Sequence, residues 1–395
     1  MRKLLLLAAT ALALASCHVL RAYRYRHFNL GDLDKLDAAP LRPSAGSFSF
    51  PVDTLRYPRL TAQLDSQLLH SRTYAFLVIR NDTILYERYF GSVTDSTRLP
   101  SFSVAKSVTG SLVARALEQG FIKSLDEPVT RYLPELGRRD AGFHSVTIRQ
   151  VLDMRSGVAS SENYGNPFSD VLKLGFARNA SKPALKVKTG TAPGNFEYKS
   201  VNTQLLALIV ERATGRKLQD YLQEQLWTPL GMEHPATWNT DKQNTVRAFC
   251  CLNLAARDYA RFGRLYLNEG MWQGKQLLSR EWIRATVSVD SMDKYEGYHN
   301  QWWSGLRYYS AYDSAGAAAV TARHTGARLS LRSTKEGRPY YLVQWRDGAY
   351  HAEGILGQYV YVNPAKKLLI VRLGHNWSHP RTGAEGFIYS LGASF

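Results

Sequence analysis

A serine and a lysine stand three residues apart in the stretch SFSVAKSVTGSLVARALEQG, at Ser103 and Lys106. The pattern predicts a helix that starts near Ser103, so Lys106 lies one turn further on the same face and its amine can reach the serine oxygen. A lysine whose pKa is lowered by burial or by neighbouring charge can take the proton of a serine hydroxyl and make it a nucleophile. The same spacing recurs at Ser291 and Lys294, in a polar stretch typical of a loop, so the four-residue pattern alone is not specific.

The elements that must position this pair are predicted from hydrophobic periodicity. Two β runs in residues 72–92, separated by Asn81-Asp82, predict a hairpin just before the Ser103 helix. Residues from 122 to about 285 have helical periodicity, including SVTIRQVLDMRSG, SVNTQLLALIVERATG and LNLAARDYARFGRLYLNEG. The segments PYYLVQWR, GQYVYVNP and KLLIVRLG then predict strands, and GAEGFIYSLGASF predicts a terminal helix. This order indicates an α+β fold, an antiparallel sheet built from both ends of the chain and flanked by helices, with a helical subdomain at about 120–290 inserted.

Length and charge exclude several classes of protein. The chain has 395 residues, of which 45% are hydrophobic and 21% charged, so general disorder is excluded. The formal net charge is +17, but the basic residues are spread along the chain without a nucleic-acid-binding motif. We therefore expect no nucleic-acid partner.

The N-terminus has the features of an export signal. MRKLLLLAATALALASC combines a basic start, an apolar run and small residues before Cys17, and Leu14 to Cys17 resembles a bacterial lipobox. We expect residues 1–17 to be a lipoprotein signal, Cys17 to be lipidated, and the protein to be exported to the bacterial cell envelope and held at a membrane, periplasmic or on the outer surface. A plain signal peptide is the alternative. Residues 18–48 are predicted to form a tether or surface wrap, and 49–395 the folded domain.

Two further cysteines are adjacent, at 250 and 251. Neighbouring cysteines form a disulfide only with strain, and no metal-ligand spacing surrounds them. The sequence therefore predicts that Cys250 and Cys251 are small buried residues.

Four collinear segments resemble the serine β-lactamase and penicillin-binding-protein superfamily, in its class C β-lactamase-related branch. They are SFSVAKS, SLDEPVTRYLPEL with VTIRQVLDMRSGV, APGNFEYKSVNTQLLALIVERATG and GILGQYVYVNP, and the similarity covers about residues 50–395. The resemblance implies that Ser103 is the acylated nucleophile, Lys106 its proton acceptor and Tyr198 the residue that shares proton transfer and protonates the leaving group. It also implies an oxyanion hole made by the backbone N–H groups of Ser103 and Gln358, and no metal or organic cofactor.

The chain departs from the superfamily pattern in two motifs. Ser200 stands where penicillin-recognising members have asparagine, and Gly354-Ile355-Leu356-Gly357 stands where they have Lys-Thr-Gly or His-x-Gly. Isoleucine cannot pair with the carboxylate of a penicillin or a D-Ala-D-Ala peptide, whereas Gly357 is expected to let a substrate approach the strand backbone. His324-Thr325-Gly326 matches His-x-Gly literally but precedes the wrong strand.

These departures resemble the 6-aminohexanoate-oligomer hydrolases and their esterase relatives. In that comparison Tyr164, in SGVASSENYGNPFSDV, contacts the substrate amide, and Trp302 and Trp303 either line the substrate site or pack in the core. The resemblance gives as substrate-binding candidates Tyr164, Ser200, Ile355, Gly357 and Trp302.

Three hypotheses follow from these residues. The first is a serine hydrolase that forms an acyl-enzyme on Ser103 and hydrolyses a small ester or amide. The second is a D-Ala-D-Ala-type peptidase or β-lactamase of the cell envelope. The third is a catalytically silent binding protein on the same fold, which would not need the matching Lys106 and Tyr198.

Overall fold

The computed structural model describes residues 18–24, 30–46, 48–53, 58–288, 297–377 and 383–395. Cys17, the rest of the predicted signal, and the Ser291 and Lys294 pair lie outside these residues. No helix within the described ranges has both the length and the apolar character needed to span a bilayer.

A seven-stranded antiparallel sheet forms the larger core, in the order β11-β12-β16-β17-β18-β2-β3. The two ends of the chain meet in this sheet, because β18 pairs with β2 from Leu368↔Arg80 onward. The strands are β2 (Thr73–Arg80), β3 (Thr83–Tyr89), β11 (Tyr298–His299), β12 (Trp302–Ser304), β16 (Tyr350–Gly354), β17 (Gln358–Asn363) and β18 (Leu368–Gly374). The predicted hairpin and the predicted sheet built from both ends of the chain are confirmed.

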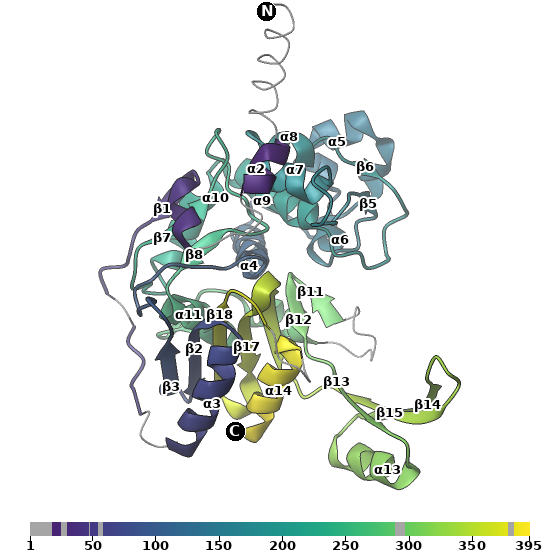
Figure 1. Ribbon diagram of the computed structural model, residues 1–395. Helices are drawn as coiled ribbons and strands as arrows, with labels where there is room; N and C mark the ends of the chain where they lie inside the picture. The colour runs from purple at the N-terminus through teal and green to yellow at the C-terminus, as the bar shows by residue number, and fades with distance from the viewer. Residues whose placement is uncertain (1–17, 25–29, 47, 54–57, 289–296, 378–382) are drawn as a thin grey trace, which may run out of the picture.

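Helices cover both faces of this sheet (Figure 1). On one face α14 (Ala384–Ser394) packs with α3 (Pro58–His70), around a cluster that includes Phe76, Tyr361 and Ile388. On the other face α11 (Ala256–Leu267) packs on β17 and β18. Gly263 permits this close approach, since a Cβ at that position would lie 2.8 Å from Val360 Cγ1.

Helix α9 (Ser200–Thr214) of the inserted part packs on α4 (Val104–Glu118), which precedes that part in the chain. Both are buried over most of their length, and α9 ends at Gly215 with a positive φ of 69°, as its sequence predicts. The shorter elements before and after α9 are η3 (Val129–Arg131), α5 (Pro134–Arg139), η4 (Ala141–Ser145), α6 (Ile148–Leu152), β5 (Val158–Ala159), α7 (Asp170–Phe176), α8 (Ser181–Ala184), β6 (Lys188–Thr189), α10 (Leu218–Leu222) and η5 (Gln223–Trp227). Beyond α11 follow β9 (Met271–Trp272) and β10 (Lys275–Gln276), which pair with each other beside α11, and α12 (Arg280–Val287), which packs on β11 and β12.

A second, four-stranded sheet brings the N-terminal segment onto the inserted part, in the order β1-β7-β8-β4. Its strands are β1 (Ala38–Leu41), β4 (Leu99–Pro100), β7 (Ala236–Asn239) and β8 (Leu252–Leu254). Strand β8 corrects one prediction, because Leu252–Leu254 was expected to belong to the helix that in fact begins at Ala256. The segment before β1 contains α2 (His18–Arg24), which packs against α7, and η1 (Leu30–Lys35).

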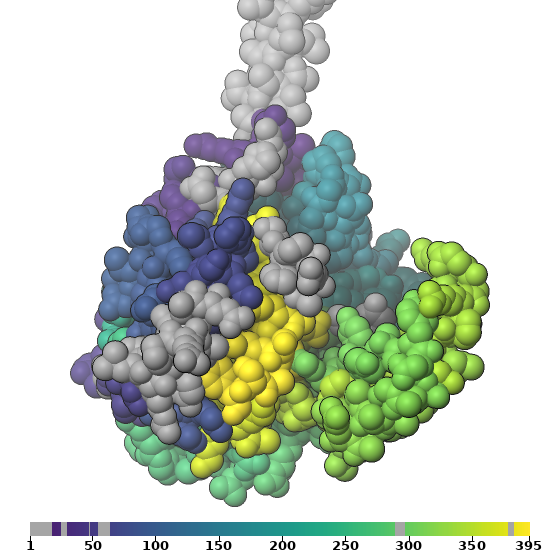
Figure 2. Space-filling view, turned by 60° about the horizontal axis from the view of Figure 1, so that its bottom comes forward, coloured from purple at the N-terminus to yellow at the C-terminus, as the bar shows by residue number. Residues whose placement is uncertain are grey.

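A small arm projects from the end of the large sheet (Figures 1 and 2). It consists of β13 (Arg307–Ala311), α13 (Ser314–Arg323), β14 (Arg328–Ser333) and β15 (Pro339–Trp345), with the strands in the order β13-β15-β14. The remaining short turns, η7 (Ile355–Gly357) and η8 (Pro364–Lys366), flank β17.

Candidate active site

Ser103 lies at the N-terminus of α4, as its N-cap residue rather than its first helical residue. The preceding Phe102 adopts a left-handed φ of 42°, which turns the chain sharply from β4 into the helix. Ser101 fixes the approach, because its N–H donates to Leu252 O at 2.9 Å and its Oγ accepts from Leu252 N at 3.1 Å. Val104 N, Ala105 N and Lys106 N donate to Ser101 O, Phe102 O and Ser103 O at 3.1, 3.1 and 2.9 Å. The N–H groups of the first helical turn therefore already have acceptors, and Ser103 itself is half-buried.

Lys106 is buried, with 1% of its surface exposed, and its ammonium donates to Ser103 Oγ at 2.8 Å. It also donates to the backbone oxygen of Phe249 at 2.9 Å. Burial lowers the pKa of Lys106 to about 8, and the charge of Glu162 opposes this shift. A substantial fraction of the lysine is therefore neutral near pH 8 and can accept the serine proton.

Tyr198 lies just before α9, and its ring centroid is 5.0 Å from Lys106 Nζ. Trp303 stacks on this ring at 5.9 Å with an interplanar angle of 18°, and Tyr298 meets its edge at 5.7 Å. Burial raises the pKa of the Tyr198 phenol well above its usual range, and a hydrogen bond with Ser103 partly opposes this. The phenol is therefore protonated at neutral pH, and the aromatic contacts hold it beside the serine and the lysine.

Glu162 accepts hydrogen bonds from two of the predicted substrate-binding residues, Ser200 and Tyr164. Its carboxylate accepts from Ser200 N at 2.8 Å and from Ser200 Oγ at 2.5 Å, and from the Tyr164 hydroxyl at 3.1 Å. Ser200 is fully buried, whereas Tyr164 is 47% exposed. Glu162 was not among the predicted site residues, although an acidic side chain two positions before the candidate Tyr164 was a signal for it.

The turn between β16 and β17 reaches the serine from the sheet side. A Cβ at Gly354 would lie 3.1 Å from Ser103 N and 2.5 Å from Ser101 O, so only glycine fits this approach. Ile355, the next residue, is 47% exposed. The backbone at Gly354 therefore lies close to the Ser103 N–H group, and Ile355 follows it directly in the chain.

Gly357 and Gln358 support this turn. A Cβ at Gly357, whose φ is 80°, would lie 2.5 Å from Arg372 Nη1, so a guanidinium and not a substrate fills the space that its missing side chain leaves. The packing of Arg372, and not the predicted approach of a substrate to the strand, therefore explains the glycine at position 357. Gln358 is buried, and its side-chain amide donates to Ile355 O at 3.0 Å and to Gly374 O at 2.7 Å.

Two other aromatic candidates lie away from the serine. Trp302 is fully buried against Tyr266, with ring centroids 4.2 Å apart, so it packs in the core, and Trp303 instead takes the position beside Tyr198. His324 lies on the arm at the end of α13, stacked on Trp345 at 4.1 Å, outside the cluster around Ser103.

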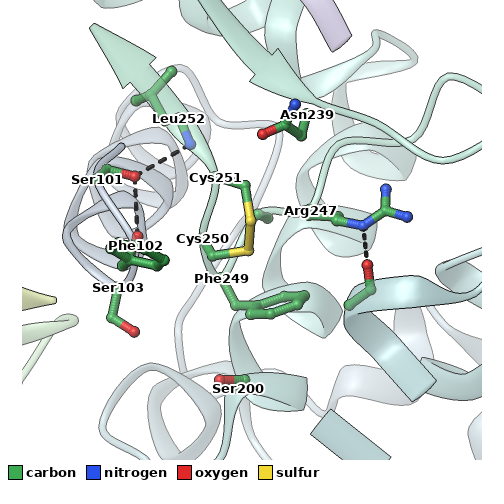
Figure 3. The surroundings of a disulfide bond; sticks show 12 residues. Ser101, Phe102, Ser103, Ser200, Asn239, Arg247, Phe249, Cys250, Cys251 and Leu252 are labelled. Carbon is green, nitrogen blue, oxygen red and sulfur yellow. Dashed lines mark hydrogen bonds between the residues drawn. A yellow bond between two sulfur atoms is a disulfide. The ribbon is translucent and has the colours of Figure 1, made fainter. Parts of the chain in front are cut away.

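Cys250 and Cys251 form a disulfide, contrary to the prediction of two buried thiols. Both residues are half-buried. Figure 3 shows the bond in the segment that leads into β8, with Phe249 between it and the side of the molecule where Ser103 and Ser200 lie. The prediction rested on the strain of a disulfide between adjacent cysteines, whereas the conformation of this turn depends on tertiary contacts that the local sequence does not reveal.

The β-lactamase family model matches residues 61–390, so the chain belongs to the β-lactamase family. It is 32% identical over 264 residues to the 6-aminohexanoate-dimer hydrolase of Paenarthrobacter ureafaciens, a match that spans 61% of this chain and 66% of that protein. It is 31% identical over 223 residues to esterase EstB of Burkholderia gladioli, spanning 50% of this chain and 55% of the esterase. These matches therefore cover between about half and two thirds of the length of the two relatives.

Solved structures confirm the predicted fold. A provisionally assigned 6-aminohexanoate-dimer hydrolase from Bacillus anthracis superimposes with a TM-score of 0.68 at 23% identity, covering 94% of this chain and 92% of that one. A class C β-lactamase in complex with cefoxitin gives a TM-score of 0.55 at 16% identity, covering 85% and 97%. The α+β, β-lactamase-like assignment is thus confirmed, and the family match with hydrolase-named relatives supports a hydrolase.

Proposed function

We propose that this protein is a serine hydrolase that forms an acyl-enzyme on Ser103 and cleaves a small ester or amide. One observation carries the proposal: the buried Lys106 amine lies 2.8 Å from Ser103 Oγ, and burial lowers its pKa to about 8. Burying a charged ammonium costs free energy, so a neutral side chain would stabilise the fold better at this position. The buried lysine is therefore better explained by a chemical role than by a structural one.

The neutral Lys106 accepts the proton as Ser103 Oγ attacks the substrate carbonyl. The Ser103 N–H lies at the helix start. For the second donor of the oxyanion hole we propose the backbone N–H of Ile355 in place of the Gln358 N–H expected from the sequence, because Gly354, directly before Ile355, lies close to Ser103. The protonated Tyr198 then gives its proton to the leaving alcohol or amine and recovers one from Lys106. In the second half, a water molecule attacks the acyl group with the same residues acting in reverse.

The side chains around Ser103 favour a substrate without a carboxylate at the position that penicillins and D-Ala-D-Ala peptides use. Ile355 occupies the third-motif position, and the acidic Glu162 lies beside Ser200 on the opposite side. The two relatives named 6-aminohexanoate-dimer hydrolase and esterase EstB are consistent with this choice. The peptidase and β-lactamase alternatives are correspondingly disfavoured.

A fluorophosphonate probe tests the acyl-enzyme directly. We expect the wild-type protein and the Ser291→Ala variant to be labelled, and the Ser103→Ala variant not to be. Intact mass and peptide mapping give the labelled residue. A correctly folded wild-type protein that does not react would favour a silent binding protein.

A substrate panel then separates the hydrolase classes. Nitrophenyl esters of increasing acyl length and linear amides of 6-aminohexanoate are compared with nitrocefin and with D-Ala-D-Ala peptides, each with Ser103→Ala as the blank. We expect turnover of the esters or linear amides to exceed that of the other two classes. Faster cleavage of nitrocefin or D-Ala-D-Ala would replace our substrate assignment.

We also propose that Cys17 carries the lipid anchor of an exported protein, on the basis of the sequence of residues 1–17 alone. Metabolic labelling with a radioactive fatty acid should mark the wild-type protein and not the Cys17→Ser variant. Equal labelling of both would exclude the anchor.

A further inference from the structure

The Phe249 carbonyl is one of two oxygens that hold the Lys106 ammonium, at 2.9 Å, and the other is the nucleophile itself. Because Lys106 is buried, bulk water cannot replace an acceptor that moves away. The position of this carbonyl therefore decides whether the amine points at Ser103 Oγ. Phe249 lies in a turn, outside any helix or strand, so its backbone is fixed only by its neighbours.

The residues that follow Phe249 are fixed unusually well for a turn. Cys250 N donates to Arg247 O at 3.0 Å, and Cys250 O accepts from Trp238 Nε1 at 2.9 Å. Cys251 O accepts from Asn239 N at 2.9 Å. The disulfide joins the two adjacent residues and so closes a small ring that includes their shared peptide bond.

Cys251 has a φ of 71°, in the left-handed region that side chains other than glycine rarely adopt. The ring removes the rotations by which an open chain would leave this conformation. The next residue, Leu252, exchanges two hydrogen bonds with Ser101, two positions before the nucleophile. On one side the disulfide follows Phe249, whose carbonyl accepts from Lys106. On the other side it precedes Leu252, and Figure 3 shows the hydrogen bond between Leu252 and Ser101.

We propose that the Cys250–Cys251 disulfide is a positioning element for Lys106, which keeps the Phe249 carbonyl on the lysine amine and so sets the turnover rate. The proposal rests on the proposed acyl-enzyme mechanism. Opening the bond with a dithiol breaks one S–S bond and forms two Cys thiols, while the dithiol is oxidised to its own cyclic disulfide, so two electrons and two protons pass to the protein. Both cysteines are half-buried, which leaves the bond within reach of a small reductant.

The first experiment measures the oxidised and the dithiothreitol-reduced full-length protein with a nitrophenyl ester. Alkylation and mapping of the peptide that contains Cys250 and Cys251 report their redox state, independently of Cys17. We expect reduction to lower kcat about tenfold, to change KM less than about twofold, and to move the acidic limb of the pH profile that Lys106 sets. Reoxidation should restore all three values.

Two double variants separate the bond from the backbone conformation. Cys250→Ser with Cys251→Ser should behave like the reduced protein and should not respond to dithiothreitol. Cys250→Ala with Cys251→Gly also lacks the bond, but glycine accepts a φ of 71° without strain, so it should retain more of kcat than the serine pair.

The inference is overturned if the protein with both cysteines alkylated has the kcat and pH profile of the oxidised wild type. The same holds if the folded serine double variant has that kcat and pH profile. Loss of fold on reduction together with full activity in the folded serine pair overturns it as well. Failure of the acyl-enzyme proposal is recognised separately, because the oxidised protein would then not be labelled at Ser103 by fluorophosphonate.

Discussion

The Glu162 carboxylate accepts both the backbone N–H and the hydroxyl of Ser200, at 2.8 and 2.5 Å. It also lies close enough to Lys106 for its negative charge to raise the pKa of that lysine against the effect of burial. A residue outside all three motifs therefore influences the protonation of Lys106, the base in the proposed mechanism.

Glu162→Gln should move the pH dependence of catalysis to lower pH. Glutamine keeps the shape of the side chain but removes the charge that favours the ammonium form, so Lys106 loses its proton at lower pH. The measurement is kcat/KM for a nitrophenyl ester between pH 6 and 10. Glu197→Gln is the matched control, since Glu197 pairs with Lys199 at 2.9 Å and should leave the profile unchanged. A profile that shifts upward in Glu162→Gln would contradict the assigned role.

The rate of acylation by the wild-type protein should rise with pH through the pKa of Lys106, at about 8. The active form has a neutral amine, which predominates above that pH and is lost below it. Single-turnover labelling at a series of pH values gives the limb. Lys106→Ala should lose the limb together with roughly 10²-fold or more of the rate, the scale of a positioned proton acceptor. A wild-type rate that is flat from pH 6 to 10 would exclude Lys106 as the base.

Tyr198→Phe should lower kcat roughly 10²-fold or more, because phenylalanine keeps the stacking on Trp303 but has no proton to give. The loss should be smaller for an ester with a good leaving group, which needs little protonation. Tyr308→Phe is the control, on a side chain of the arm that is 73% exposed. Equal rates for Tyr198→Phe and the wild type would remove the phenol from the mechanism.

Gly354→Ala should impair catalysis more than it impairs folding. The new methyl group would lie 2.5 Å from Ser101 O and 3.1 Å from Ser103 N, so the turn must move away from the serine. We expect a loss of kcat of at least tenfold and a destabilisation of about 1–3 kcal/mol, the usual cost of overpacking. Gly175→Ala has open space around its Cβ and serves as the control. Urea unfolding and ester kinetics on the same preparations separate the two effects.

Arg372→Met should destabilise the protein strongly. The guanidinium is fully buried and donates to five neutral oxygens, those of Thr73 Oγ1 and of the backbone at Ser71, Leu356, Gly357 and Asn376. Methionine leaves these oxygens without their donor, and we expect a loss of about 3–5 kcal/mol in urea unfolding. Arg332→Met, on the exposed edge of the arm, should cost less than about 0.5 kcal/mol. Similar unfolding midpoints for the two variants would show that Arg372 does not hold the turn.

Local patterns predicted much of the fold correctly. The hairpin at 73–89, the helix after Ser103, the helix ending at Gly215 and the last two strands all have strong periodicity and clear end signals, which depend on neighbouring residues only. The short strands β4, β7 and β8 were missed, since two to four residues carry no usable period and form only where a partner strand is available.

For the site, the sequence by itself determined the types and the order of Ser103, Lys106 and Tyr198, because one helical turn links the first two and the resemblance in motifs places the third. Only the tertiary structure decided which residues surround them. Glu162, the Phe249 carbonyl and Trp303 come close through the packing of separate segments, and Trp302, one residue from Trp303, points into the core instead. The disulfide between Cys250 and Cys251 likewise depends on the tertiary structure. The contacts that hold its turn come from Trp238 and Asn239 in β7 and from Arg247 in the loop that follows β7. Spacing along the chain fixes what a single helix can bring together, whereas contacts between elements depend on the packing of the whole core.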